Sequence, residues 1–278
     1  MLCRSPRYKL TSEYAGTRYS GWQIQPNART VQGELERALR TVAARGRLET
    51  YGSGRTDAGV HALAQIAHVD VASPLPTDTL VVRTNAALPH DINVLAAERV
   101  PPRFHARHSA VARSYLYQIA RRRTAFAKPF VWWIREPLDV DRMRDGASRL
   151  VGLADFRGFT DADPDEQSTK VLIDAITIAP AGDLLLIRVV GSHFLWRMVR
   201  RLVGVLAHVG RGELDPGAVL THAAADTGLA ARLTAPASGL FLERVFYDPP
   251  PPAWPLVPAG FGVATDSLRP GTADRHDG

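Results

Sequence analysis

Alternation of apolar and polar positions predicts strands at several places in the first half of the chain. Residues 8–14 (YKLTSEY) and 64–71 (AQIAHVDV) alternate with the period of two that a half-buried strand requires. Shorter runs at 48–52 and 92–98 predict two more strands. Helical spacing appears instead in residues 30–45, after the N-capping side chain of Thr30, and again in 75–88 before Pro89. The order β-α-β-β-α-β is the split βαβ, or ferredoxin-like, pattern.

The second half of the chain repeats this mixture of strands and helices, although no sequence repeat is visible. Apolar patterns predict strands at 110–120 and 239–247, a short strand at 131–134, and a hairpin of 175–179 with 184–191. Helices are expected at 140–151, capped by Asp139 or Asp141, at 193–209 and at 216–225. We therefore expect an α+β fold of two ferredoxin-like lobes that form a mixed, mainly antiparallel sheet with helices on one side.

Changes of composition suggest where these lobes begin and end. We expect a flexible N-terminus at 1–7, an N-terminal lobe at 8–100 and a C-terminal lobe at 101–248, joined near Pro101 and Pro102. Residues 249–278 are rich in Pro, Gly and polar side chains, which predicts a disordered tail.

Charge adds a binding partner to this picture. The chain carries a net charge of +6, and no acid occurs between Glu98 and Glu136 or from Leu184 to Gly212. The first of these stretches interleaves arginines with aromatic side chains and includes Arg107 and Arg113. Long stretches of one sign suit phosphates, so we expect a central basic cleft that binds nucleic acid, with Arg107 and Arg113 among its contacts.

Other classes of protein find little support in the sequence. No run of about 18 apolar residues occurs, and the first residues lack the apolar region of a signal peptide. The single cysteine, Cys3, favours a reducing, cytoplasmic setting and leaves no cysteine zinc site. No HExxH, Walker or GxGxxG motif is present, so we expect neither a metal nor an organic cofactor.

The loop Gly54-Arg55-Thr56-Asp57-Ala58-Gly59-Val60-His61 is the most specific feature that could carry chemistry. Its glycines allow a tight turn or a close approach to a ligand. Arg55 lies two residues from Asp57, near enough to orient the carboxylate as a nucleophile or base requires. The structural alternative is an Asx-type turn, in which Asp57 bonds its own backbone and Arg55 lies on the surface. Spacing alone leaves both interpretations open.

A resemblance to a known family favours the first. The segment GRTDAGVHA resembles the signature loop of the tRNA pseudouridine synthase A family (TruA). Further segments resemble the family's motifs in the same order, over about residues 8–247: YAG with YSGWQ, TVQ, NAALP with DI, FHAR with RSY, MVR with VG, and APA with GL. As a member of that family, the chain would convert uridine to pseudouridine at positions 38, 39 and 40 of the tRNA anticodon stem-loop, as a homodimer without an organic cofactor.

The resemblance also implies roles for individual residues. Asp57 would be the catalytic carboxylate and Arg55 its partner, which helps to hold the base pocket open. Tyr115 would lie over the uracil ring and help to remove the proton at C5, and Leu240 would form an apolar wall. Arg200 would pair with Asp57 or with a phosphate.

Two departures and two rival functions accompany this interpretation. Where many members of the family carry a basic residue in a Thr-x-Arg-like run, this chain has Lys170 followed by Val-Leu-Ile-Asp, and the tail after Asp248 matches no role in the family. An RNA-binding module without chemistry would need no Asp57 beside Arg55. A glycosylase that releases uracil is the other rival, although glycoside hydrolysis usually requires two carboxylates.

Overall fold

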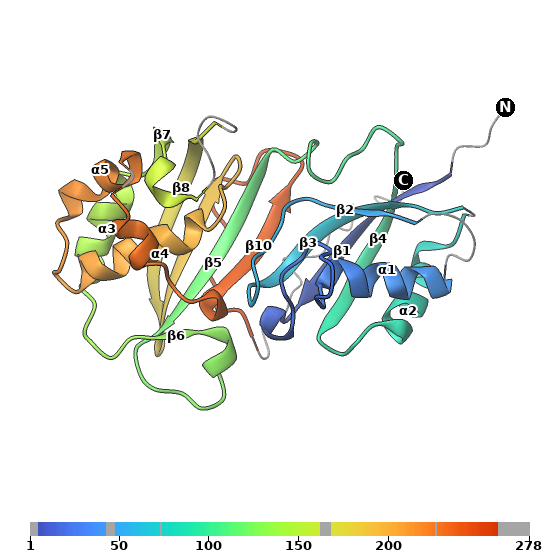
Figure 1. The fold of residues 1–278 in the computed structure, drawn as a ribbon, viewed down its shortest axis with the longest axis horizontal. Helices are drawn as coiled ribbons and strands as arrows, with labels where there is room; N and C mark the ends of the chain where they lie inside the picture. The colour runs from blue at the N-terminus through green and yellow to red at the C-terminus, as the bar shows by residue number, and fades with distance from the viewer. Residues whose placement is uncertain (1–4, 43–47, 73, 162–167, 226, 261–278) are drawn as a thin grey trace, which may run out of the picture.

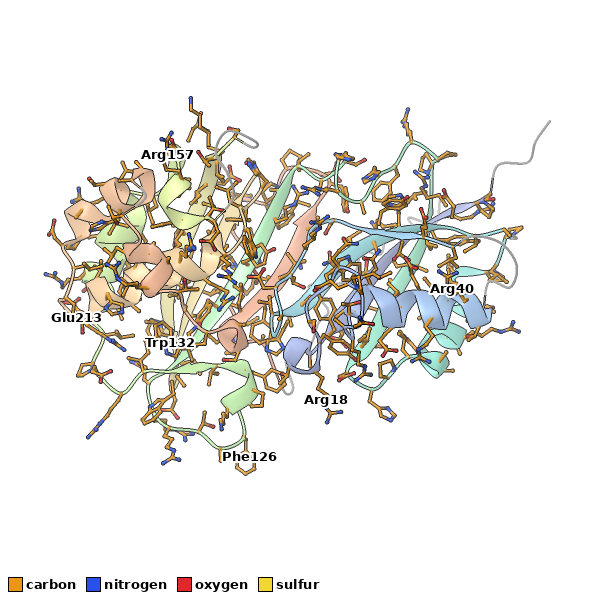
Figure 2. All side chains as sticks on the ribbon, in the orientation of Figure 1. Arg18, Arg40, Phe126, Trp132, Arg157 and Glu213 are labelled. Atoms are coloured by element: carbon orange, nitrogen blue, oxygen red, sulfur yellow. The ribbon has the colours of Figure 1, made fainter. Side chains whose placement is uncertain are left out.

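The N-terminal half forms the expected β-α-β-β-α-β unit (Figure 1). The computed structural model describes residues 5–42, 48–72, 74–161, 168–225 and 227–260. The elements of this half are β1 (Arg7–Tyr14), η1 (Gly16–Arg18), α1 (Val31–Val42), β2 (Thr50–Gly52), β3 (His61–Asp70), α2 (Thr77–Ala87) and β4 (Ile92–Val100). The Thr30 hydroxyl accepts a hydrogen bond from the Gly33 amide at 3.3 Å, which confirms the predicted N-cap of α1. Residues 43–45 of the predicted helix lie outside the described residues.

The C-terminal half has more elements than its sequence pattern suggests. They are β5 (Ala112–Ala120), η2 (Lys128–Phe130), β6 (Trp132–Trp133), α3 (Val140–Ser148), β7 (Gly152–Asp155), η3 (Arg157–Phe159), β8 (Lys170–Ala181), β9 (Leu184–Gly191), α4 (Met198–Gly210), η4 (Pro216–Ala218), α5 (Val219–Ala224), α6 (Leu229–Arg232), η5 (Ala237–Gly239) and β10 (Leu240–Phe246). Asp139 caps α3, since its carboxylate accepts hydrogen bonds from two amides of the first turn, those of Asp141 and Arg142.

One sheet runs through both halves. Its strand order is β4-β1-β3-β10-β5-β9-β8-β7, with β2 paired to β3 and β6 paired to β5. The last strand, β10, lies parallel to β3 and antiparallel to β5, so it joins the two halves at the centre. The α+β fold with a mixed, mostly antiparallel sheet is therefore confirmed, and Figure 1 shows β10 beside β5 in the middle of the molecule.

The two faces of this sheet bury different clusters. On β5, Tyr117 and Ile119 pack with residues of α3 and α4, whereas Leu116 packs with Phe241 and Leu186 in a separate cluster. Because successive side chains of a strand point to opposite faces, these clusters lie on opposite sides of the sheet. The helices α1 and α2 share a cluster with Leu242 of β10, so the helices of both halves cover the same face. We call this the helical face and the other one the back face.

Three helices differ from the pattern, and left-handed backbone at Arg197 explains the first difference. Residues 193–197, which were expected to be helical, precede α4, because Arg197 has a φ of 61° and no helix can continue through that conformation. The helix expected at 140–151 ends at Ser148, and Gly152, with a φ of 108°, begins the unpredicted strand β7. The helix expected at 216–225 is divided into η4 and α5.

The chain after Asp248 does not fit the prediction of a disordered tail as far as Gly260. The Gln118 side chain forms two hydrogen bonds with the Ala259 backbone, donating to its carbonyl at 3.2 Å and accepting from its amide at 2.7 Å. Arg188, which forms a buried ion pair with Glu243 at 2.5 Å, donates to the carbonyls of Trp254 and Pro255. These groups all lie on the back face, so the segment 249–260 is held there by hydrogen bonds that composition alone does not reveal. Residues 261–278 lie outside the described residues.

The first strand begins one residue before the N-terminal lobe that composition suggested. Arg7 is the first residue of β1, and its guanidinium binds the Asp70 carboxylate at 2.7 Å and the carbonyls of Pro102 and Phe104. These bonds tie the start of β1 to β3 and to the segment between the lobes. Residues 1–4 are outside the described residues.

Replacing Trp254 tests whether the segment 249–260 stabilises the fold. The indole lies under the Arg188 guanidinium at 4.4 Å and edge-on to Phe246 at 5.4 Å. We expect Trp254→Ala to lower the free energy of unfolding by about 2 kcal/mol, the sum of one cation–π and one aromatic contact. Urea unfolding measures it. Pro251→Ala, an exposed position in the same segment, is the control. Equal unfolding curves for both variants would contradict this assignment.

His68 should make stability depend on pH. Its Nδ1 accepts a hydrogen bond from the Ala106 amide at 3.1 Å. Burial, with smaller effects from the charges of Arg7 and His105, lowers its pKa to about 4, although Asp70 opposes the shift. The unfolded chain therefore binds a proton near pH 6.5, before the folded chain does, and stability falls as the pH drops from 6.5 to 4.

In His68→Asn, the amide oxygen can still accept from Ala106, but the titration is gone. We expect the slope of unfolding free energy between pH 4 and 6.5 to decrease by up to about 1.4 kcal/mol per pH unit, the value for one proton. Parallel stability profiles for wild type and variant would show that His68 does not cause this dependence.

Candidate functional site

The loop that carries Asp57 connects β2 to β3 and is fixed at both ends. At its start, the Ser53 amide donates to the Ile66 carbonyl at 2.7 Å, and the Ser53 hydroxyl donates to the Gln65 side chain at 2.7 Å. At its end, the Val60 amide donates to the Asp57 carbonyl at 3.1 Å, which closes a turn around Ala58 and Gly59. This turn places Asp57 at the tip of a short, anchored loop.

Residues of β1 and of the loop after it bind Thr56, the residue before Asp57. The buried Thr56 hydroxyl bonds the Tyr14 hydroxyl at 2.8 Å, and the Thr56 carbonyl accepts from the Trp22 amide at 3.0 Å. Burial raises the pKa of Tyr14 to about 12, so its phenol stays protonated at neutral pH. Gly21 fits against this carbonyl with a φ of 91°, where a Cβ would lie 2.6 Å from the Thr56 oxygen. These contacts fix Thr56, and the backbone of Asp57 directly after it has little freedom to move.

Asp57 is paired with Arg200 of α4. The Arg200 Nη1 lies 3.4 Å from the Asp57 Oδ2, and both side chains are largely buried, with 17% and 23% of their surface exposed. The Arg200 Nε donates to the Ala235 carbonyl at 2.8 Å, which fixes the guanidinium. A close approach makes this contact possible, since a Cβ on Gly204 would lie 1.7 Å from the Leu233 carbonyl oxygen. The pairing of Arg200 with Asp57 that the resemblance implied is present.

Arg55 is placed differently from the expectation. Its side chain is exposed, and among the described residues it makes no ion pair or hydrogen bond. Among the described residues, the ion pair that Asp57 forms is with Arg200, and no ion pair with Arg55 is present. Arg55 instead presents a positive charge beside the site.

Tyr115 lies where the two large clusters of the helical face meet. Its half-buried ring packs against both of them and meets Phe194 edge-on at 5.2 Å. Burial raises the pKa of Tyr115, and the charges of Tyr14 and Asp57 raise it further. Tyr115 is therefore a neutral phenol at physiological pH. It lies close enough to Asp57 for the carboxylate charge to raise its pKa.

Two leucines of β10 complete the apolar part of this region. Leu240 is buried and pairs in register with Tyr117, whereas Leu242 pairs with Tyr115. Both point to the helical face, as their clusters show. Leu240 therefore belongs to the core, in the apolar cluster against which Tyr115 packs.

The two arginines before Tyr115 have different surroundings. Arg113 donates to the carbonyls of Ser53, Arg107 and Ser192 at 3.1, 2.9 and 2.8 Å. Burial lowers the pKa of Arg113, but a guanidinium group is too weak an acid to lose its charge at neutral pH. Arg113 thus joins the start of the Asp57 loop to the segment after β9. Arg107 remains exposed.

The arginines at the start of α4 do not form an exposed row. Arg201 is buried and binds the Asp161 carboxylate, which also pairs with Arg197 at 3.3 Å. Arg197, Arg200 and Arg201 therefore all have acidic partners. Lys170, at the departure from the family's pattern, is exposed at the first position of β8.

One cavity among the described residues lies away from Asp57. It has a volume of about 370 Å³ on the back face, where the segment 254–260 covers His61 of β3 and Phe241 of β10, and Asp57 is not part of its lining. Within the described residues there is no group of three or more side chains suited to a metal. No helix in that part of the chain is long and apolar enough to cross a bilayer.

Several supporting contacts had no signal in the sequence. Asp57 and Arg200 are 143 residues apart, and nothing in the spacing predicts that Ala235 or Phe194 approaches them. Tyr14 and Gln65 lie on alternating strands and are indistinguishable there from ordinary core residues. Only the topology, with β10 between β3 and β5, brings these segments together.

Comparisons with known proteins relate the chain to one family. The family model described as tRNA pseudouridine synthase matches residues 10–109 and 147–248. The tRNA pseudouridine synthase A of Rhodopseudomonas palustris strain BisA53 is 42% identical over 246 residues, 87% of this chain and all of that one. The protein of the same name from Parvibaculum lavamentivorans is 40% identical over 246 residues, again 87% of this chain and 100% of its own. Among solved structures, a Cbf5-Nop10-Gar1 complex aligns over 72% of this chain and 54% of that one with 9% identity and a TM-score of 0.33, too low to bear on the fold.

Gly21→Ala tests whether the site depends on the close support of the loop. The new Cβ would meet the Thr56 carbonyl, and the backbone would be strained at a φ of 91°. We expect a loss of more than about 1 kcal/mol in unfolding free energy and a larger loss of activity on the substrate proposed below. Gly54→Ala is the stability control, because its Cβ would have nothing within 4 Å. Unchanged stability and activity in Gly21→Ala would contradict the fixed loop.

Proposed function

Because the chain belongs to the tRNA pseudouridine synthase family, we propose that its isomerase activity converts uridine to pseudouridine in the anticodon stem-loop with Asp57 as the catalytic carboxylate. The observation that carries this proposal is the position of Asp57: an anchored turn, an ion pair with Arg200, and the nearby ring of Tyr115. The isomerisation requires a carboxylate beside the reacting base. The motif residues Asp57, Tyr115 and Arg200 come together around this one carboxylate.

The isomerisation of uridine requires one carboxylate, and no group is transferred from another molecule. The N1–C1′ bond breaks, the uracil turns, and a C5–C1′ bond forms, while the proton lost from C5 is replaced by one gained at N1. The Asp57 carboxylate either attacks the sugar or the ring or removes the C2′ proton. Arg200 holds the carboxylate in place, and the hydrogen bond from its Nε to Ala235 restricts its own movement.

Tyr115 contributes as a ring and as a neutral phenol. Because its pKa is raised, it is not a phenolate base in the resting site, and we assign it a stacking contact over the flipped uracil. Any transfer of the C5 proton through its oxygen would have to pass a proton on at the same time. Leu240 would keep water from the separated sugar and base.

The target nucleotide has to leave its stack before it reaches Asp57. Turning a base out of a helix costs a few kcal/mol, and stacking on Tyr115 returns about 1–3 kcal/mol. The exposed guanidinium groups of Arg55 and Arg107 are suited to bind the backbone phosphates on either side. Arg113 would act by holding the loop, since its guanidinium is engaged with backbone carbonyls.

We assign the finer substrate and setting on the resemblance described above. The proposed targets are uridines 38, 39 and 40, and the active form is a homodimer in the cytoplasm. No cofactor or metal takes part in the proposed reaction. The 42% identity over the whole length of a relative named tRNA pseudouridine synthase A supports these assignments.

Asp57→Asn tests the proposal directly. With undermodified tRNA labelled with tritium at C5 of uridine, we expect the wild type to release tritium and form pseudouridine. The variant should lose roughly 10²–10⁴-fold in rate while it still binds the tRNA, since it lacks the group that performs the chemistry. Asp78→Asn, an exposed acid in the first turn of α2, is the matched control and should keep full activity.

Each alternative has its own result in this assay. Free uracil as the product would identify a glycosylase, and tRNA binding by the wild type without any product would identify a binding module. An active Asp57→Asn enzyme would remove Asp57 from the mechanism.

A further inference from the structure

Trp196 is an exposed indole in the segment between β9 and α4, to which the roles proposed above assign nothing. With 52% of its surface accessible, it is among the most exposed large apolar side chains of the described residues. Tryptophan is usually well buried, and at surfaces it marks contact sites. The chain on both sides of it reaches the site: Phe194 meets Tyr115 edge-on, and Arg200 pairs with Asp57.

The backbone after Trp196 is unusual as well. Arg197 occupies the left-handed region with a φ of 61°, which is unfavourable for any residue with a Cβ and which glycine would adopt without strain. The arginine side chain has contacts that glycine would lack. Its guanidinium lies over the Trp196 ring at 4.5 Å and binds the Asp161 carboxylate at 3.3 Å. The turn therefore holds the indole outward with a cation against it.

Several positive charges lie near the same segment, together with the Asp161 carboxylate that pairs with Arg197 and Arg201. The pKa of His193 is lowered, chiefly by burial and then by the charges of Arg113 and Arg107, so these two guanidinium groups lie near it. No acidic residue occurs from Leu184 to Gly212. An exposed aromatic ring backed by arginine among positive charges has the chemistry of a platform for a nucleobase, whose backbone phosphates the arginines attract.

We propose that Trp196, held by Arg197, stacks against an unpaired base of the RNA substrate next to the flipped nucleotide and strengthens the binding of the RNA. This inference rests on the proposed function and assigns a substrate contact to a position outside the motif residues quoted above. The contact is made with the ground-state complex, so it acts on RNA binding and leaves the chemical step unchanged.

Trp196→Leu and Trp196→Phe separate stacking from simple apolar packing. Leucine keeps an apolar side chain without a π face, and we expect it to raise KM and the Kd for an anticodon stem-loop RNA roughly tenfold, equivalent to about 1.4 kcal/mol, with kcat unchanged. Phenylalanine should stay within about threefold of wild type, since it can still stack. Trp133→Leu is the matched control, because this indole is 43% exposed and its strand pairs with the opposite end of β5 from the segment that contains Trp196.

Binding measured in the Asp57→Asn background keeps this test independent of turnover. Wild-type pseudouridine formation combined with an unchanged Kd for Trp196→Leu would overturn the stacking contact and leave the proposed function standing. A weakened Kd without any pseudouridine in the wild type would support the contact and refute the chemistry. A fall in kcat with unchanged Kd and KM would mean that Trp196 only supports the fold of the site, which also overturns the proposal.

Fluorescence gives a second readout. The difference between the emission of wild type and Trp196→Phe isolates the Trp196 signal. We expect stem-loop RNA to quench this signal and to protect it from acrylamide. A Trp196 signal that is unaffected by saturating RNA would exclude the contact.

Discussion

The pairing of β10 between β3 and β5 is the constraint on which the site depends. It forces the last strand of the chain to run parallel to the strand that follows the Asp57 loop and antiparallel to the strand that carries Tyr115. Asp57 comes from one half of the chain and Arg200 and Leu240 from the other, so neither half alone contains the proposed catalytic apparatus. The cost of closing a loop this long is small compared with the burial of a central strand, which makes the arrangement stable.

The two faces of the sheet hold different parts of the molecule, the proposed active site on one and the final segment on the other. The helical face has Tyr115, Leu240 and the two clusters beneath the helices, whereas the back face has the buried Arg188–Glu243 pair and the segment 249–260. Burying two charges is costly unless their hydrogen bonds are satisfied. The Ser114 hydroxyl and the carbonyls of Trp254 and Pro255 satisfy them, so the final segment completes the back face as part of the fold.

Local patterns predicted much of the fold, because alternation and capping act over a few residues. The β-α-β-β-α-β order and the N-caps at Thr30 and Asp139 follow from such patterns. The start of α4 did not, because Arg197 adopts a backbone conformation that residues with a Cβ seldom take. Nor did the partner of Asp57: spacing left a pair with Arg55 open beside an Asx-type turn, whereas Arg200 approaches from 143 residues away. The resemblance supplied that contact, and no local rule could have done so.

Counting charges in the sequence also overstates what is free to meet RNA. Arg113 is engaged with backbone carbonyls, Arg188 and Arg201 are buried with carboxylates, and Arg200 is shared between Asp57 and Ala235. An arginine with its donors already used cannot also form a bidentate bond to phosphate without breaking them. These anchored side chains fix geometry instead. The exposed guanidinium groups, such as those of Arg55 and Arg107, then provide the attraction, so the positive charge serves two physical purposes that the sequence alone does not distinguish.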